Sequence, residues 1–183
     1  MTLPPFKSFT TKRLKLRKLK ISDAPEILMI RSDDRVNQYI DRPPTINIGE
    51  AEAFINKVNT GIKNNECYYW GVTFKDEDSV IGTICLWKFE QDERKAETGY
   101  ELHPDHQQQG IMNEALSTIM DFALGTIKLA AVEAFIDPEN TASARLLEKR
   151  NFVKYRQEVS GDNGKKLFVY LLSPPKAVGR TDR

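Results

Sequence analysis

The sequence predicts an α/β (α+β) fold with a mixed, mostly antiparallel central sheet flanked by helices. Three segments rich in apolar and aromatic residues lie between residues 68 and 102, and only short polar links separate them. Links this short join antiparallel neighbours. A further strand-like segment, Leu129–Ile136, follows a predicted helix, so we expect it to run parallel to the strand before that helix.

Length and composition indicate one ordinary globular domain covering residues 1–183. The chain has 40% hydrophobic and 29% charged residues, and its formal net charge of +1 points to no particular partner. A core at about residues 11–172 would be followed by a flexible tail at 173–183, which contains two prolines and four charged residues.

Cysteine usage and hydropathy favour a cytoplasmic protein. Cys67 and Cys85 lack Cys-x-x-Cys spacing, as expected of free thiols in a reducing compartment. No run is long and apolar enough to span a bilayer, and the basic first twenty residues contain no signal-peptide core. We therefore expect no membrane partner.

The amino-terminal part predicts an irregular lead-in over residues 1–10 and then a strand. Six basic residues between 12 and 20 are interleaved with leucines, and the alternation around Leu14 and Leu16 is that of a half-buried strand with a solvated basic face. The alternative is a basic patch that contacts ribosomal RNA or acidic segments. Without aromatic residues between the charges, sequence-specific nucleic-acid binding is not expected.

Two helices are predicted next. Ser22 or Asp23 would cap the first, with Pro25 in its first turn. A second helix is expected from about Gly49 to about Lys63, after a break at Arg42-Pro43-Pro44. The apolar residues assigned to their buried sides are Ile27, Leu28 and Ile30 in the first helix, and Ala53, Phe54, Val58 and Ile62 in the second.

Three strands are expected at Tyr68–Phe74, Val80–Phe89 and Ala96–Leu102, with polar turns at 75–79 and 90–95. Consecutive antiparallel pairing is the simplest arrangement of strands joined in this way. The middle of the chain is therefore expected to form a meander.

A helix beginning at Gly110 should end near Gly125, which suits the left-handed position after a helix. A later helix has readable ends, because Asn140 is a good N-cap and Asn151 suits the left-handed position that follows, with Phe152 folding back on Leu147.

The carboxy-terminal part predicts a hairpin. Its strands are Phe152–Val159 and Lys165–Leu172, joined across residues 160–164.

The turn from His103 to Leu116 places a polar loop before a helix start. Unpaired backbone N–H groups and the positive end of the helix dipole suit a phosphate or pyrophosphate there, and Gly110 would permit a close approach. The loop is neither a Walker motif nor a dinucleotide fingerprint. A purely structural turn explains this segment, taken alone, equally well.

Together with the segment Asp137–Phe152, this loop resembles the GCN5-related N-acetyltransferase superfamily. That family's acetyl-CoA loop reads Gln/Arg-x-x-Gly-x-Gly/Ala, and its later helix reads Asn-x-x-Ser-x-x-Leu-x-x-Lys-x-Gly-Phe. The matching positions here are Gln107, Gly110, Met112, Asn140, Ser143, Leu146, Lys149, Asn151 and Phe152. The runs Gly99–Pro104 and Gly110–Ala115 are most similar to the branch that acetylates N-termini of ribosomal proteins, the Rim type.

The resemblance implies a sheet of about six or seven strands that splays at an acetyl-CoA site. Acetyl-CoA would be the cosubstrate, with its pyrophosphate on the backbone N–H groups of residues 108–112 and its thioester carbonyl polarised by an N–H near Leu102. The implied cofactor-binding residues are Leu102, Gln107, Gln108, Gln109, Gly110, Ile111, Met112, Asn113, Asn140 and Ser143.

The resemblance also implies catalytic candidates. An N-terminal amine has a pKa of about 7.7–8.0, against about 10.4 for lysine, so it needs only a weak base. Glu158 matches the base of Rim-type enzymes, Glu101 is a second possible base, and Ser143 matches the residue that protonates the leaving thiolate. Each also has a structural explanation: strand glutamates are commonly ion-paired, and serine is favourable in a first helical turn.

The expected function is transfer of an acetyl group to a primary amine, first of all the N-terminal α-amine of a ribosomal or other protein, by direct attack in a ternary complex. Cys85 lies in an apolar strand and is a poor nucleophile. The alternatives are a small-molecule amine, such as a polyamine or aminoglycoside, and a non-catalytic CoA sensor. His103 and His106 lack further ligands, so no metal is expected. A monomer and a homodimer both stay open.

Overall fold

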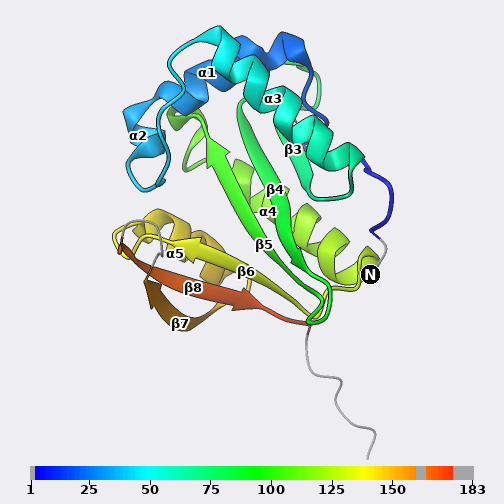
Figure 1. Ribbon diagram of the computed structural model, residues 1–183, viewed down its shortest axis with the longest axis vertical. Helices are drawn as coiled ribbons and strands as arrows, with labels where there is room; N and C mark the ends of the chain where they lie inside the picture. Colours follow the sequence, from blue (N-terminus) through cyan, green and yellow to red (C-terminus); the bar gives the residue numbers. More distant parts are fainter. Residues whose placement is uncertain (1–2, 160–163, 175–183) are drawn as a thin grey trace, which may run out of the picture.

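The computed structural model describes residues 3–159 and 164–174 and contains one sheet of eight strands in the order β1-β2-β3-β4-β5-β6-β8-β7 (Figure 1). The strands are β1 (Phe9–Thr10), β2 (Leu14–Arg17), β3 (Tyr68–Phe74), β4 (Gly82–Glu90), β5 (Lys95–Leu102), β6 (Ala131–Ile136), β7 (Val153–Val159) and β8 (Lys166–Leu172). The helices are α1 (Ala24–Ser32), α2 (Asp34–Asn37), α3 (Ile48–Lys63), α4 (Ile111–Asp121) and α5 (Thr141–Lys149), with helical turns η1 (Ile21–Asp23), η2 (Pro104–His106) and η3 (Phe122–Thr126).

The predicted fold class is confirmed. Neighbouring strands are antiparallel, apart from β5 and β6, which pair in parallel across the connection through α4. The sheet has slightly more strands than expected, because residues Phe9–Thr10 of the predicted irregular lead-in pair with β2.

The lead-in also packs against the core. Its backbone accepts hydrogen bonds from the Tyr68 hydroxyl and from Trp70 Nε1, the latter at 2.8 Å from Lys7 O. These contacts hold the lead-in against β3.

Helices cover both faces of the sheet, because alternate residues of a strand point in opposite directions. Trp70 packs in the main core beneath α4, whereas its neighbour Tyr69 packs against the cluster formed by α1 and α3. Figure 1 shows α4 behind the sheet, with α1 and α3 across the upper part of the sheet in front. We call these the α4 face and the α1 face.

Strand β2, the first strand expected from the sequence, differs from the prediction in one basic residue. Leu14 and Leu16 are buried as expected, but Arg17 is only 5% exposed, so the basic face is not solvated throughout. Arg17 donates to both carboxylate oxygens of Asp23 at 2.8 and 2.9 Å. The buried guanidinium is tolerated because this carboxylate compensates its charge.

Helix α3 begins beside its N-cap Asn47, close to the predicted start, and buries Val58 and Ile62 as expected. Ala53, however, is exposed, and Ile55 occupies the core instead. The predicted apolar side was therefore rotated slightly from the true one.

The end of α4 also differs from the prediction. Gly125 does not adopt the expected left-handed conformation; it lies inside the π-helical turn η3, and Lys128 takes a positive φ of 63° instead. The wider turn is closed by a hydrogen bond of 3.0 Å from Ile127 N to Phe122 O. The helix therefore continues past the expected glycine stop.

Asp23 stands at the N-cap position of α1, but its side chain does not cap the helix. The predicted ends of α5 are confirmed. Asn140 Oδ1 accepts a hydrogen bond from Ser143 N at 3.0 Å, Asn151 has a φ of 63°, and Phe152 N bonds Leu147 O at 3.0 Å. Strands β7 and β8 pair as the expected hairpin. Most of the predicted turn at 160–164, and the tail beyond residue 174, lie outside the described residues.

Arg17→Met should lower the free energy of unfolding by about 3–5 kcal/mol, because it leaves the Asp23 carboxylate buried without its counter-charge. Urea denaturation measures this change. Arg35→Met is the matched control, since the Arg35 side chain is 64% exposed in its ion pair with Asp33. Equal losses in both variants would contradict a special role for the buried pair.

Candidate functional site

Strands β5 and β6 diverge at the centre of the sheet. Their pairing covers Lys95–Glu97 and Ala131–Glu133, whereas β5 pairs with β4 as far as Leu102. Figure 1 shows the two strands spreading apart like the arms of a V. The facing edges beyond this pairing carry backbone groups that an extended ligand can bind.

The direction of the backbone groups follows from one bond at the end of β5. His103 N donates to Ile81 O at 2.9 Å, on the β4 side. Because successive N–H groups of a strand point in opposite directions, the N–H of Leu102 points towards the gap. Leu102 O accepts a bond of 3.2 Å from Gln107 Nε2.

The loop after β5 brings the predicted residues 107–113 to the start of α4. Gln108 and Gly110 have positive φ values of 59° and 72°, and in the described part of the chain no side-chain hydrogen bond caps the helix at Gly110. Ile111 and Met112 are buried in the core, with 1% and 6% exposure. These two residues therefore offer a ligand their backbone N–H groups rather than their side chains.

Two arginines that the sequence analysis did not single out stand beside this helix start. Arg13 Nη1 donates to Gln109 O at 2.9 Å, while Arg150 Nε donates to Asn113 Oδ1 at 2.7 Å. They border an open pocket of about 400 Å³ whose lining residues are Arg13, Gly110, Asn113, Glu114, Ser117, Thr118 and Arg150. Glu114 in this lining pairs with Arg13, so the positive charge in excess is that of Arg150, beside the start of α4. This combination suits an anion.

Ser143 lies in the first turn of α5, on the far side of the gap from β5. It is 8% exposed, and its Oγ is 2.6 Å from the Tyr100 hydroxyl. Burial raises the pKa of Tyr100 to about 12, so the phenol is protonated at neutral pH. Tyr100 was missed because nothing in its local sequence indicates a partner 43 residues away.

Glu101 lies on the α1 face and is held by two arginines. Arg42 donates to both carboxylate oxygens, the Oε2 bond measuring 2.8 Å, and Arg31 Nη1 lies 3.3 Å from Oε1. The three side chains are 10–15% exposed. Both carboxylate oxygens are thus occupied by guanidinium groups, which weakens the case for Glu101 as a base.

Glu158 lies on β7 and is more accessible than Glu101. Its side chain is 42% exposed and accepts a bond of 2.6 Å from Arg156 Nε; Arg156 also reaches Glu133 of β6 at 2.8 Å. The strand register places Glu133 opposite Glu97 of β5. Gly99 and Glu101 follow Glu97 at two and four positions along β5, and residues at even spacing on a strand share one face. Glu158 and Glu101 therefore share the α1 face, whereas Ser143 and Tyr100 lie on the α4 face.

Cysteine chemistry is disfavoured at this site. Cys85 is 9% exposed on β4, and burial raises the pKa of its thiol to about 12. A thiolate nucleophile is therefore scarce at neutral pH. Among the described residues there is no cluster of three or more His, Cys, Asp or Glu side chains that would hold a metal.

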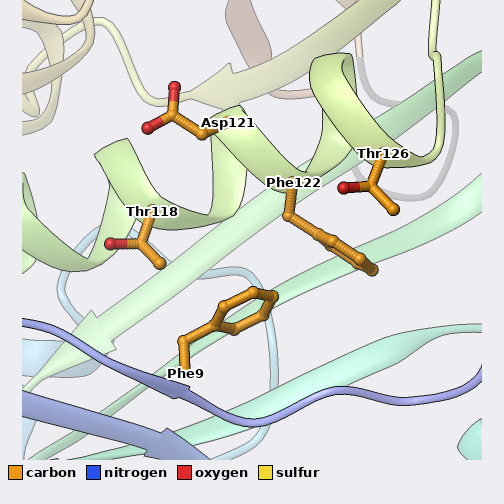
Figure 2. Close-up of a pocket in the computed structure, with 5 residues that line it drawn as sticks. All are labelled: Phe9, Thr118, Asp121, Phe122 and Thr126. Carbon is orange, nitrogen blue, oxygen red and sulfur yellow. The ribbon is translucent and has the colours of Figure 1, made fainter.

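Another hollow lies between β1 and the far end of α4. Figure 2 shows the rings of Phe9 and Phe122 turned towards each other, with Thr118, Asp121 and Thr126 around them; the ring centroids are 5.2 Å apart. It contains none of the predicted site residues.

No described helix has the length and apolar character needed to cross a membrane.

Comparison with known proteins identifies the family. Residues 13–153 match the model of the acetyltransferase (GNAT) domain. The chain is 30% identical over 165 residues to an uncharacterized N-acetyltransferase, p20, of Bacillus licheniformis, covering 89% of this chain and 93% of the relative.

Two solved structures extend the comparison. RimL, a ribosomal L7/L12 α-N-protein acetyltransferase in complex with coenzyme A, has a TM-score of 0.80 at 18% identity, covering 91% of this chain and 98% of the other. A spermidine N-acetyltransferase, a chimera of the Vibrio cholerae enzyme and hSSAT, has a TM-score of 0.73 at 21% identity, covering 87% and 95%. At these identities the structures show a shared fold.

Glu101→Gln should lower the free energy of unfolding by about 3 kcal/mol, because the two arginines lose their counter-charge in a mostly buried setting. The same change at the more exposed Glu158 should cost less than about 1 kcal/mol. Urea denaturation of both variants tests this difference. A Glu101→Gln protein as stable as the Glu158→Gln protein would refute the compensating role of Glu101.

Proposed function

The chain belongs to the GNAT acetyltransferase family, and we propose that this N-acetyltransferase transfers the acetyl group of acetyl-CoA to the N-terminal α-amine of a protein. The observation that carries the proposal is the divergence of β5 and β6 beside the uncapped start of α4. It supplies a passage for an extended thioester next to a site for its phosphates.

The backbone arrangement supports the expected position of acetyl-CoA. Its pyrophosphate would lie on the N–H groups of residues 108–112, with Arg150 adding positive charge at the neighbouring pocket, where Arg13 is paired with Glu114. The pantetheine arm would pair with the exposed edge of β5. The Leu102 N–H, directed into the gap, would then donate to the thioester carbonyl oxygen as negative charge develops on it.

The two faces of the sheet would divide the reaction between them. The amine would enter from the α1 face, where Glu158 and Glu101 lie, and the sulfur would leave towards Ser143 on the α4 face. In direct transfer within a ternary complex the amine would add to the carbonyl carbon, and the thiolate would leave from the tetrahedral intermediate so formed. We retain Glu158 as the candidate base, acting directly or through a water.

The charge immediately around Glu101 favours an α-amine over a polycation. Arg31 and Arg42 carry two positive charges against the single negative charge of Glu101, and all three are largely shielded from water. A net positive cluster repels a second and third ammonium group. It also favours the neutral form of an amine whose pKa is already only about 7.7–8.0. A small polyamine is the alternative acceptor, motivated by the fold shared with the spermidine enzyme.

Mixing the protein and acetyl-CoA with a panel of N-terminal peptides, spermidine and aminoglycosides should release CoA rapidly with a peptide and slowly with the polycations. Thiol release measures turnover, and N-acetylated peptides of the same sequence are the matched controls. Faster turnover with spermidine than with every peptide would overturn the proposed acceptor. Binding of acetyl-CoA without turnover on any amine would favour a CoA sensor.

Glu158→Gln should lower kcat about 10²-fold or more, as expected for loss of a general base, while leaving the affinity for acetyl-CoA unchanged. Steady-state kinetics and calorimetric titration separate these quantities. The control is Glu148→Gln, since the Glu148 carboxylate accepts a bond of 3.1 Å from Tyr170, away from the gap. An unchanged kcat in Glu158→Gln would remove this carboxylate from the mechanism.

A further inference from the structure

The hydroxyl groups of Tyr100 and Ser143 join the two sides of the gap between β5 and β6. Tyr100 comes from the diverging part of β5, and Ser143 from the first turn of the helix that follows β6; their oxygens are 2.6 Å apart. A thioester threaded between these strands passes this hydroxyl pair. With acetyl-CoA bound as proposed above, the pair would therefore lie near the leaving sulfur.

The chemistry of the two groups sets the direction of their hydrogen bond. A phenol is a stronger acid than an aliphatic alcohol, so the Tyr100 O–H is the better donor and Ser143 Oγ the better acceptor. The backbone of Ser143 is fixed by its bond to Asn140 Oδ1 at 3.0 Å. When Tyr100 donates this bond, the hydroxyl proton of Ser143 is free to be donated to another acceptor. A ligand in the gap would supply that acceptor.

We propose that Tyr100 is a positioning residue which, by donating to Ser143 Oγ, directs the Ser143 hydroxyl at the sulfur of CoA and stabilises its thiolate. The inference rests on the proposed function, because it needs CoA in the gap. Two donors in series stabilise a charge better than one, since each hydrogen bond polarises the next.

The proposed step is balanced. The amine nitrogen forms a bond to the carbonyl carbon, the carbon–sulfur bond breaks, and its electron pair goes to sulfur. The thiolate is held by the Ser143 hydrogen bond and then takes a proton from water. The attacking nitrogen releases one proton to the base or to water, so no further reactant is needed.

The thiol of bound CoA provides a test that needs no acceptor. Its pKa, followed by the ultraviolet absorbance of the thiolate during a pH titration of the CoA complex, should lie about one unit lower in the wild type than in Ser143→Ala. Tyr100→Phe should raise it by part of that amount. In the double variant, Tyr100→Phe should add nothing, because Tyr100 acts only through Ser143.

Tyr170→Phe is the matched control. Its ring is also buried on the α4 face, but its hydroxyl bonds the exposed Glu148 at 3.1 Å. This variant should leave the thiol pKa unchanged. Ser143→Thr, which retains the hydroxyl, should preserve the wild-type value. Thermal unfolding checks that each variant is folded. If Tyr100→Phe is not folded, Tyr100→Met replaces it.

Two results would overturn the inference: a thiol pKa that is the same in the wild type and Tyr100→Phe, or equal effects of Tyr100→Phe in the presence and absence of the Ser143 hydroxyl. A general loss of packing would change the melting temperature without this dependence on Ser143. Failure of the wild type to bind CoA would instead refute the proposed function, so the two failures are distinguishable.

Discussion

The short parallel pairing of β5 with β6 is the constraint on which the rest of the site depends. The strands share hydrogen bonds over Lys95–Glu97 and then separate, although both continue as strands held by their other neighbours, β4 and β8. The outer pairings keep the two arms rigid, so the gap is a fixed feature of the sheet. Beyond the paired residues, backbone donors and acceptors on the facing edges of β5 and β6 are not bonded to each other.

Ion pairs fasten the segments around this gap. Glu101 on β5 forms ion pairs with Arg31 of α1 and with Arg42 of the segment between α2 and α3. Arg13 bonds Gln109 O in the loop before α4 and pairs with Glu114 in that helix. Because a mostly buried charge pair is costly to break, the α1 face is held in one geometry. A site whose parts are held before the ligand arrives loses less entropy when it binds.

The two faces of the sheet have different chemistry. The α1 face carries carboxylates and guanidinium groups, which suit an amine that must lose its proton, whereas the α4 face offers hydroxyls and a helix start, which suit a thiolate and phosphates. The proposed reaction uses both faces through one opening. In the proposed reaction, this separation would keep the group that accepts a proton from the amine apart from the groups that stabilise the sulfur.

The sequence by itself determined the elements whose signals are local: the strands of the meander, the caps at Asn140 and Asn151, and the loop that leads into α4 at Gly110. These depend on residues within one or two turns of each other. Only the tertiary structure decided the burial of Arg17 and the pairing of Glu101 with Arg42, 59 residues away. It likewise brought Tyr100 to Ser143. Such contacts depend on how distant segments pack, which no local pattern specifies, and the roles of Glu158 and Ser143 therefore stay predictions.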